Sequence, residues 1–417
     1  MAMFWAGPVY AESAEPLPPM PEKQFSAAET KAIADYRAAF GEYKRAREAH
    51  ERKGDAYWER IEDKRAARRA KRAKGGVLEL SDYVLDQPPA YSGPSEPKRP
   101  AFLPLPPAPK VKKKPPLRDL PVVADFLTQA RLKFKFVPDK PKAEIDYKRA
   151  YARAAVAAGI TKDQAVRIYG FEAGGNGEYD VQAGLEAKKK GSKPISTALG
   201  YNQLLVANSL GLLAEHGAAI GANLDKRAEG ASPARRKALK VKGAALLRMV
   251  KYARSIPYRW AVHERVARTP KGWAVHALIL DTDIGPLLQT QKLVNSLEYA
   301  RRGGHTRPMS AAELELMNLT GDGNGFDMLT MPVAMRDKVP TSNFFQRGGY
   351  QRNPVASRNN TVASLIAAMD RRMDHNAGLD GAKQLAAAFQ EVIASADPPP
   401  AAPPAPAEGA RGNALTR

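Results

Sequence analysis

The 34 prolines of this chain are concentrated outside its middle, and their distribution sets where a globular domain can form. Residues 75–120 contain the runs QPPAYSGPSEPKRP and PLPPAPKVKKKPP, and residues 396–417 contain DPPPAAPPAPA. Proline at this density removes the amide hydrogens that helices and β-ladders need and favours extended polyproline II backbone. We therefore expect a linker at 75–120, a disordered tail at 396–417 and one globular domain at 121–395.

The pattern within residues 121–395 is mainly helical. Thr161-Lys-Asp-Gln164 is a capping box, which predicts a helix that runs to Glu172. Ser232 followed by Pro233 is typical of an N-cap and a first helical position. Further helices are predicted at residues 145–158, 199–215, 285–300, 311–319, 361–374 and 381–395, while residues 260–266 and 272–279 fit either a strand or a helix. The expected fold class is mainly α.

Residues 25–74 have the pattern of a charged helical arm. The capping box Ser26-Ala-Ala-Glu29 predicts its start, and the basic run KRAARRAKRAK occupies residues 64–74. No aromatic residue is interleaved with this run to stack on bases, so we interpret it as a solvated helix end rather than a nucleic-acid site.

The net charge of +21 predicts an anionic partner, which could be nucleic acid, an acidic membrane surface or the anionic cell envelope. The absence of cysteine excludes disulfides, cysteine-ligated zinc and a thiol nucleophile. The six histidines form no HExxH pattern, so we expect no metal site. No apolar run approaches the ~20 residues that cross a bilayer, and no transmembrane segment is expected.

The first 24 residues allow two interpretations. An apolar stretch at residues 2–9 is followed by Val9-Tyr10-Ala11, which has the small-x-Ala form of a signal-peptidase site, but no positive charge precedes it. It is therefore either a truncated signal peptide, which implies a periplasmic or secreted protein, or a frayed terminus.

Glu172 is the candidate catalytic residue. It lies in GFEAGGNG at residues 170–177, where it continues the apolar stripe formed by Ala165, Ile168 and Tyr169. A carboxyl group on a core-facing stripe is partly desolvated, which raises its pKa and suits a general acid. Gly174 and Gly175 then end the helix and leave the carboxyl group unobstructed. An ordinary helix-end glutamate is the alternative reading.

A second pattern follows 31 residues after Glu172. Ala198-Leu-Gly-Tyr-Asn-Gln203 is expected to open the next helix, with Gln203 pointing inward because it is four residues from both Leu199 and Ala207. A buried glutamine needs hydrogen-bond partners for its amide, and a groove beside Glu172 could supply them. The alternative is that Gly200 allows close helix packing and Gln203 bonds to the backbone.

Together these patterns resemble the lytic transglycosylases of the goose-type-lysozyme-like fold, over about residues 145–215. That family places a catalytic glutamate at a helix end and a small-Gly-x-x-Gln signature beside the cleft. The serine that usually follows the glutamate is Ala173 here. The resemblance implies a lysozyme-like helical domain in which Glu172 is catalytic, Gly200, Tyr201 and Gln203 contact the substrate, and no cofactor is needed.

Further substrate contacts are expected at four other positions. The family's Tyr-Asn element has two candidate counterparts, Asn295 with Tyr299 on a late helix, and Tyr350 in NFFQRGGY at residues 343–350. Asp180, in the loop GNGEYDVQAG, could act as a second carboxylate, which would favour hydrolysis. Gly321-Asp-Gly-Asn-Gly-Phe-Asp327 lacks the order of a calcium loop, so we interpret it as a glycine-rich turn.

The resemblance implies cleavage of peptidoglycan between N-acetylmuramic acid and N-acetylglucosamine, with one glutamate as both acid and base and a 1,6-anhydro product. Two alternatives stay open. One is a non-catalytic protein of the same fold that binds or scaffolds peptidoglycan, and the other is a basic nucleic-acid-binding protein. The expected partners are glycan strands, with the basic arm attracted to the anionic envelope.

Overall fold

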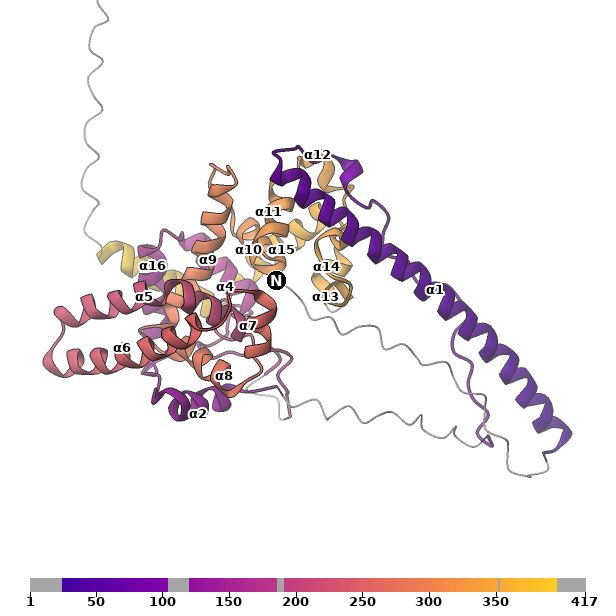
Figure 1. Cartoon of the computed structure of the whole chain (residues 1–417), viewed down its shortest axis with the longest axis horizontal. Coiled ribbons are helices and arrows are strands. Elements are labelled where there is room, and N and C mark those ends of the chain that lie inside the picture. The colour runs from indigo at the N-terminus through magenta and orange to yellow at the C-terminus, as the bar shows by residue number, and fades with distance from the viewer. Residues whose placement is uncertain (1–24, 104–119, 186–190, 352, 396–417) are drawn as a thin grey trace, which may run out of the picture.

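The computed structural model describes residues 25–103, 120–185, 191–351 and 353–395 and shows a mainly helical protein (Figure 1). Within these residues the only β-structure consists of isolated bridges, between Gln182 and Leu199, Leu199 and Leu204, and Pro340 and Thr361. The expected signal peptide at residues 1–24 and tail at 396–417 lie outside the described residues. No helix in the described part of the chain is long and apolar enough to cross a membrane.

The helices expected from capping residues form where the sequence predicts them. Thr161 caps α4 (Lys162–Glu172), and its side chain accepts a hydrogen bond from the backbone N–H of Gln164. Pro233 is the first residue of α6 (Pro233–Arg254), as predicted. Helix α10 (Ala311–Thr320) was predicted without its cap, which is Ser310. The other predicted helices are α3 (Glu144–Ala157), α9 (Gly285–Arg302), α15 (Val362–Ala377) and α16 (Asp380–Ser395).

Several elements differ from the expectation or were not predicted. The two ambiguous segments are helices, α7 (Trp260–Val266) and α8 (Pro270–His276), and the glycine-rich segment is not a turn because its residues begin α11 (Asp322–Thr330). Short helices that were not predicted lie within the expected linker, at the start of the domain, directly after α8 and near residue 340. They are η1 (Leu80–Asp82), α2 (Val123–Phe134), η2 (Ala277–Leu280), α12 (Val333–Arg336), η3 (Thr341–Phe344), α13 (Arg347–Gln351) and α14 (Pro354–Arg358).

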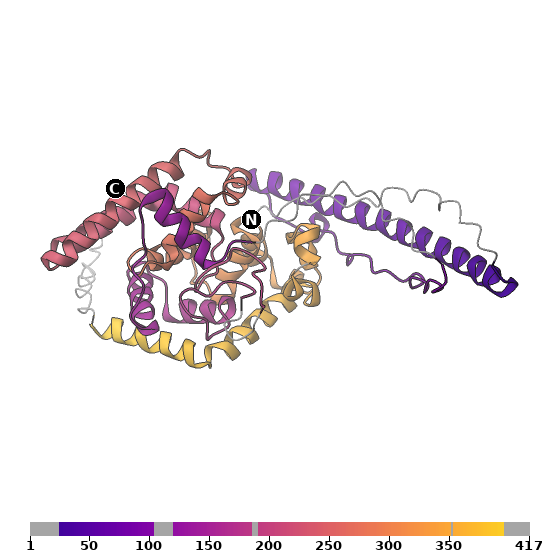
Figure 2. The same cartoon turned by 90° about the horizontal axis from the view of Figure 1, so that it is seen from below.

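Two hydrophobic cores lie side by side. The first combines apolar residues of α3, α4, α10, α15 and α16, and the second combines those of α2, α8 and η2 with the long antiparallel pair α5 (Val206–Glu229) and α6. The pair α5 and α6 extends away from the body of the protein (Figures 1 and 2). Helix α9 contributes to both cores, with Leu288 in the second and Leu293 in the first.

The arm is one continuous helix, α1 (Ala27–Ala73), and its N-terminal half extends away from the body (Figure 1). Its 47 residues correspond to a length of about 70 Å. The chain after α1 returns along it, and the ring of Tyr91 lies edge-on to Tyr43 at 6.4 Å between centroids and under the guanidinium group of Arg47.

The C-terminal half of α1 belongs to the first core, which corrects the expectation of a separate arm and a solvated basic run. Tyr57, Trp58 and Ile61 are buried in that core together with Tyr83 and Val84 from the expected linker. Within the basic run, Arg65 and Arg68 are buried as well. The sequence did not reveal this because their partners, residues 327 to 345, lie more than 250 positions further along the chain.

Candidate active site

Glu172 is the last residue of α4, and the backbone that follows is shaped by glycine. Gly174 and Gly175 have φ angles of +70° and +77°, a region in which other residues are strained. A β-carbon at position 175 would lie 2.5 Å from the carbonyl oxygen of Asn376, so only glycine fits there. The chain therefore turns sharply away after Glu172, which is half-buried at the helix end.

Two side chains of α10 hold the carboxyl group of Glu172. The Nδ2 of Asn318 donates a hydrogen bond to its Oε1 at 2.8 Å and also lies 3.3 Å from Oε1 of Glu315. Glu315 is fully buried and is hydrogen-bonded to Glu172. Residues 315 and 318 are three apart on one helix, so their side chains point to the same place.

Burial raises the pKa of Glu172, although the hydrogen bonds from Glu315 and Asn318 and the nearby positive charge of Arg372 oppose this effect. Burial also raises the pKa of Glu315 well above its usual range, and the proximity of Glu172 adds to that rise. Since two carboxylates in contact cannot both ionise easily, the pair retains a proton beyond the pH at which a solvated glutamate loses it.

Glu315 does not have the position of a second catalytic carboxylate. Hydrolytic glycosidases separate their two carboxyl groups by roughly 5 Å or more so that a sugar or a water molecule fits between them. Glu172 and Glu315 are instead in direct hydrogen-bond contact, and Glu315 is absent from the cleft lining. It acts on Glu172 and not on anything bound in the cleft.

Glu172 and Asn318 line an open cleft of about 910 Å³ between the two cores. One wall comes from α4, α9 and α10, and the other from α5 and α7. Two aromatic side chains, Tyr258 and Trp260, lie on the second wall. Cationic groups also line the cleft, among them Lys292 and Arg372, and Arg372 lies over the ring of Phe171 at 4.9 Å.

The Ala198–Gln203 signature forms a tight turn rather than the start of a helix, which corrects the predicted helix at 199–215. Leu199 and Leu204 exchange two backbone hydrogen bonds, and α5 begins only at Val206. Gly200 has a φ of +78° and Gln203 a φ of +43°, which no helix can accommodate. The turn lies beside residues 181–183, because Gly200 N–H donates to the carbonyl oxygen of Val181.

Gln203 lines the cleft, and its side chain also supports the turn. Its Nε2 donates to the carbonyl oxygens of Val181 at 3.1 Å and Gly200 at 2.8 Å. Both interpretations made from the sequence therefore hold in part, since the amide nitrogen bonds to backbone while the residue lies on the cleft wall.

Tyr201 and Gly200 are not positioned to contact a ligand in the cleft. Tyr201 is fully buried, its hydroxyl donates to Glu144, and its ring meets those of Tyr147, Tyr151 and Tyr169 edge-on. A β-carbon at position 200 would lie 2.8 Å from Oε1 of Gln289, so Gly200 is needed for close packing. These two residues are packed behind the cleft wall and support it.

The remaining candidates are dispersed. Asn295 lines the cleft, and its Oδ1 accepts a hydrogen bond from Gln291. Tyr299 lines a second cavity instead, and Asp180 is absent from the lining of the cleft. Tyr350 is buried against Trp58 and Phe345, which corrects the expectation that it binds a sugar.

Sequence reasoning missed Glu315, Asn318 and His263. An acid inside the apolar run Leu314-Glu-Leu-Met317 was a usable signal, because a buried carboxyl group needs a partner. His263 is buried on the cleft wall, and its Nε2 has no hydrogen-bond partner in the described chain. Burial lowers its pKa, so its imidazole is neutral near pH 7.

Among the described residues, no group of three or more histidine and carboxylate side chains is placed to hold a metal ion.

Comparisons of the chain with protein-family models, with curated proteins and with solved structures find no match. The features of the chain that point to a function are the geometry of the cleft and the resemblance carried by Glu172 and residues 198–203.

Proposed function

We propose that this protein is a lytic-transglycosylase-like enzyme that cleaves the bond between N-acetylmuramic acid and N-acetylglucosamine in peptidoglycan. The observation that carries the proposal is the environment of Glu172. Its carboxyl group lies on the wall of an open cleft with a raised pKa, and its neighbouring carboxyl group is a hydrogen-bond partner rather than an opposing catalytic group. One glutamate then has to serve as both acid and base.

The proposed reaction uses a single proton on Glu172. Protonated Glu172 transfers it to the glycosidic oxygen as the bond from C1 of the muramic acid breaks, and N-acetylglucosamine leaves as an alcohol. The 2-acetamido group stabilises the cationic centre at C1. The carboxylate then takes the proton of the muramic acid 6-hydroxyl, whose oxygen bonds to C1 and closes the 1,6-anhydro ring. Glu172 regains its proton, and no water is consumed.

The lining of the cleft suits a polar polymer. Tyr258 is 65% exposed and offers a ring face to a sugar, as does Trp260. Amide side chains of Gln203, Asn208 and Asn295 face the same space and can bond to hydroxyl and acetamido groups. The cationic groups suit the anionic character of the proposed substrate.

The proposal places the protein in the cell envelope, either periplasmic or secreted, and this depends on a signal sequence within residues 1–24. The nucleic-acid alternative loses support because Arg65 and Arg68 of the basic run are buried. The non-catalytic alternative predicts that the protein binds glycan strands in this cleft without cleaving them.

Incubation with purified sacculi tests the proposal. Mass spectrometry of the soluble products should find muropeptides that end in 1,6-anhydro-N-acetylmuramic acid. Reducing ends in their place would assign hydrolysis and contradict the proposed reaction. Intact glycan strands with the protein bound would favour the non-catalytic alternative.

A further inference from the structure

A second cavity, of about 870 Å³, lies where α1 meets α9 and α11. Its lining is strongly basic, because five arginines contribute to it from two helices that are distant in sequence. These are Arg65, Arg68, Arg69 and Arg72 of α1 and Arg302 at the end of α9. The proposed activity at Glu172 uses none of them.

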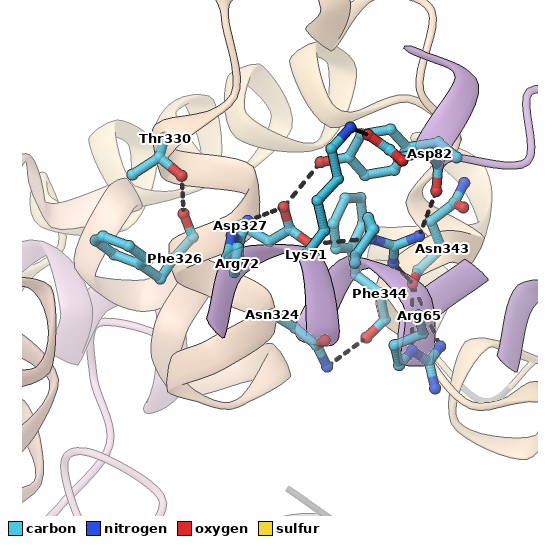
Figure 3. A network of polar contacts seen from close by, with 12 residues as sticks. Arg65, Lys71, Arg72, Asp82, Asn324, Phe326, Asp327, Thr330, Asn343 and Phe344 are labelled. Carbon is cyan, nitrogen blue, oxygen red and sulfur yellow. Dashed lines mark hydrogen bonds and ion pairs between the residues drawn. The ribbon is translucent and has the colours of Figure 1, made fainter. Parts of the chain in front are cut away.

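The two acidic residues of this cavity are already engaged by other groups. Asp327 pairs with Arg68 at 3.1 Å and with Arg72, and it also accepts a hydrogen bond from Tyr83 (Figure 3). Asp322 accepts hydrogen bonds from Ser296 at 2.7 Å and Lys292 at 3.4 Å. Neither carboxylate is left to neutralise the other arginines.

Three guanidinium groups in this lining therefore have no carboxylate partner within the described residues: those of Arg65, Arg69 and Arg302. Arg69 and Arg302 are exposed at the mouth of the cavity. Arg65 is more than nine-tenths buried, and its hydrogen bonds to the part of the chain that the structure describes go to the carbonyl oxygens of Asn343 and Phe345, which lie outside the cavity lining (Figure 3).

A buried cation without a counter-charge is costly, and proteins normally pair it. Burial, together with the neighbouring charges of Arg68 and Arg69, lowers the pKa of Arg65 to about 10, so it is still charged at neutral pH. The first turn of α11 adds backbone N–H groups at Gly323 and Asn324 on the same cavity wall. Each of these features favours a bound anion.

We propose that this cavity is a binding site for a phosphate monoester of sugar-phosphate size. Arginine forks match the oxygens of phosphate, and a monoester carries close to two negative charges at pH 7, which suits the two exposed, unpaired guanidinium groups of Arg69 and Arg302 better than one carboxylate does. The cavity is larger than a free phosphate requires. Tyr299, 38% exposed and packed edge-on against Phe326, supplies an aromatic surface on which a sugar ring can rest.

This site is independent of the activity proposed for Glu172, although the two cavities share a wall at Gly321 and Asp322. A ligand here would touch the segment that joins α10, which carries Glu315 and Asn318, to α11. Direct binding measurements therefore test this site whether or not the cleft cleaves glycan.

The test is calorimetric titration of the full-length protein with N-acetylglucosamine 1-phosphate, inorganic phosphate and unphosphorylated N-acetylglucosamine at constant ionic strength. We expect the sugar phosphate to bind most tightly, inorganic phosphate more weakly and the neutral sugar not measurably. Arg69→Gln and Arg302→Gln should each weaken sugar-phosphate binding by about tenfold or more. Arg301→Gln is the matched control, because its side chain is exposed on the same helix and is absent from the cavity lining.

The proposal would be overturned if wild type, Arg69→Gln and Arg302→Gln bound the sugar phosphate with equal affinity. It would also be overturned if Arg301→Gln lost as much affinity for the sugar phosphate as the two cavity variants. The proposal would also be overturned if single-stranded DNA bound more tightly than the sugar phosphate and needed the same two arginines. That result would assign the cavity to a polynucleotide backbone. The tested arginines are exposed, so the melting temperatures of their variants should match wild type and exclude misfolding.

Discussion

At the scale of single residues, Glu172 on the cleft wall and Glu315 behind it form a hydrogen-bonded pair of carboxyl groups, both with a raised pKa. The reaction proposed for this cleft begins only from protonated Glu172, and the raised pKa of Glu172 extends that form toward neutral pH. Activity should therefore fall as the pH rises through this raised pKa. Glu315 lowers the pKa of Glu172 by donating a hydrogen bond, so its removal should move the alkaline limit of activity to higher pH.

Glu315→Leu removes this donor and should shift the alkaline limb of the kcat/KM profile upward, whereas Glu315→Gln retains an N–H donor and should leave the limb near its wild-type position. The pH–rate profiles of the three proteins check this expectation. An unshifted limb in Glu315→Leu, or an equal shift in both variants, would show that Glu315 does not position the proton of Glu172.

Gly200 lies in the turn behind the cleft, where its role is close packing against Gln289. Gly200→Leu introduces a β-carbon against Gln289 at a φ of +78°, so it combines overpacking with backbone strain. We expect a loss of about 2–4 kcal/mol in the free energy of unfolding, measured by chemical denaturation. Gly243→Leu is the matched control, because a β-carbon there meets nothing within 4 Å. Similar stabilities for the two variants would contradict the packing role.

At the scale of elements, the attachment of α1 depends on the buried ion pair between Arg68 and Asp327, whose side chains are 2% and 6% exposed. Asp327→Asn leaves a buried guanidinium group without its counter-charge and should cost about 3–5 kcal/mol in the free energy of unfolding. Asp86→Asn breaks an exposed pair with Arg60 and should cost less than about 1 kcal/mol. Chemical denaturation of both variants measures the difference, and equal costs would mean that the buried pair does not hold α1 in place.

Sequence reasoning succeeded for elements whose boundaries are encoded locally. Ser26 and Thr161 form the predicted capping boxes with residues three positions on, and proline at position 233 suits a first helical turn. It failed at residues 198–204, because apolar spacing alone cannot show that Gly200 and Gln203 adopt positive φ.

The candidate site was predictable only in part, because some of its residues meet through contacts that are remote in sequence. Glu172 and Gln203 were found from local patterns, but Glu315 and Asn318 reach Glu172 across more than 140 positions. The burial of Arg65 and Arg68 depends on equally remote partners. Long-range contacts of this kind leave only an indirect signal, a charged residue within an apolar or amphipathic stretch.

At the scale of the whole molecule, α1 and the helical domain should behave as one unit. A site for a specific protease inserted within residues 104–119 would cut the chain between them. Because Tyr57, Trp58 and Ile61 are buried in the first core, the two fragments should co-elute in gel filtration and separate only in denaturant. Separation under native conditions would contradict the shared core.

The cleft itself is a property of the whole molecule, since Glu172 comes from the first core and the opposite wall, with Tyr258 and His263, comes from the second. The catalytic claim for this cleft is tested most directly by Glu172→Gln on purified sacculi, with Glu178→Gln, an exposed acid outside the cleft lining, as the matched control. Glutamine retains the shape of the side chain but cannot transfer a proton, so release of 1,6-anhydro muropeptides should fall by about 10²–10⁴-fold while sacculus binding is unchanged. Glu178→Gln should release products at the wild-type rate. Near-wild-type release by Glu172→Gln would contradict the account.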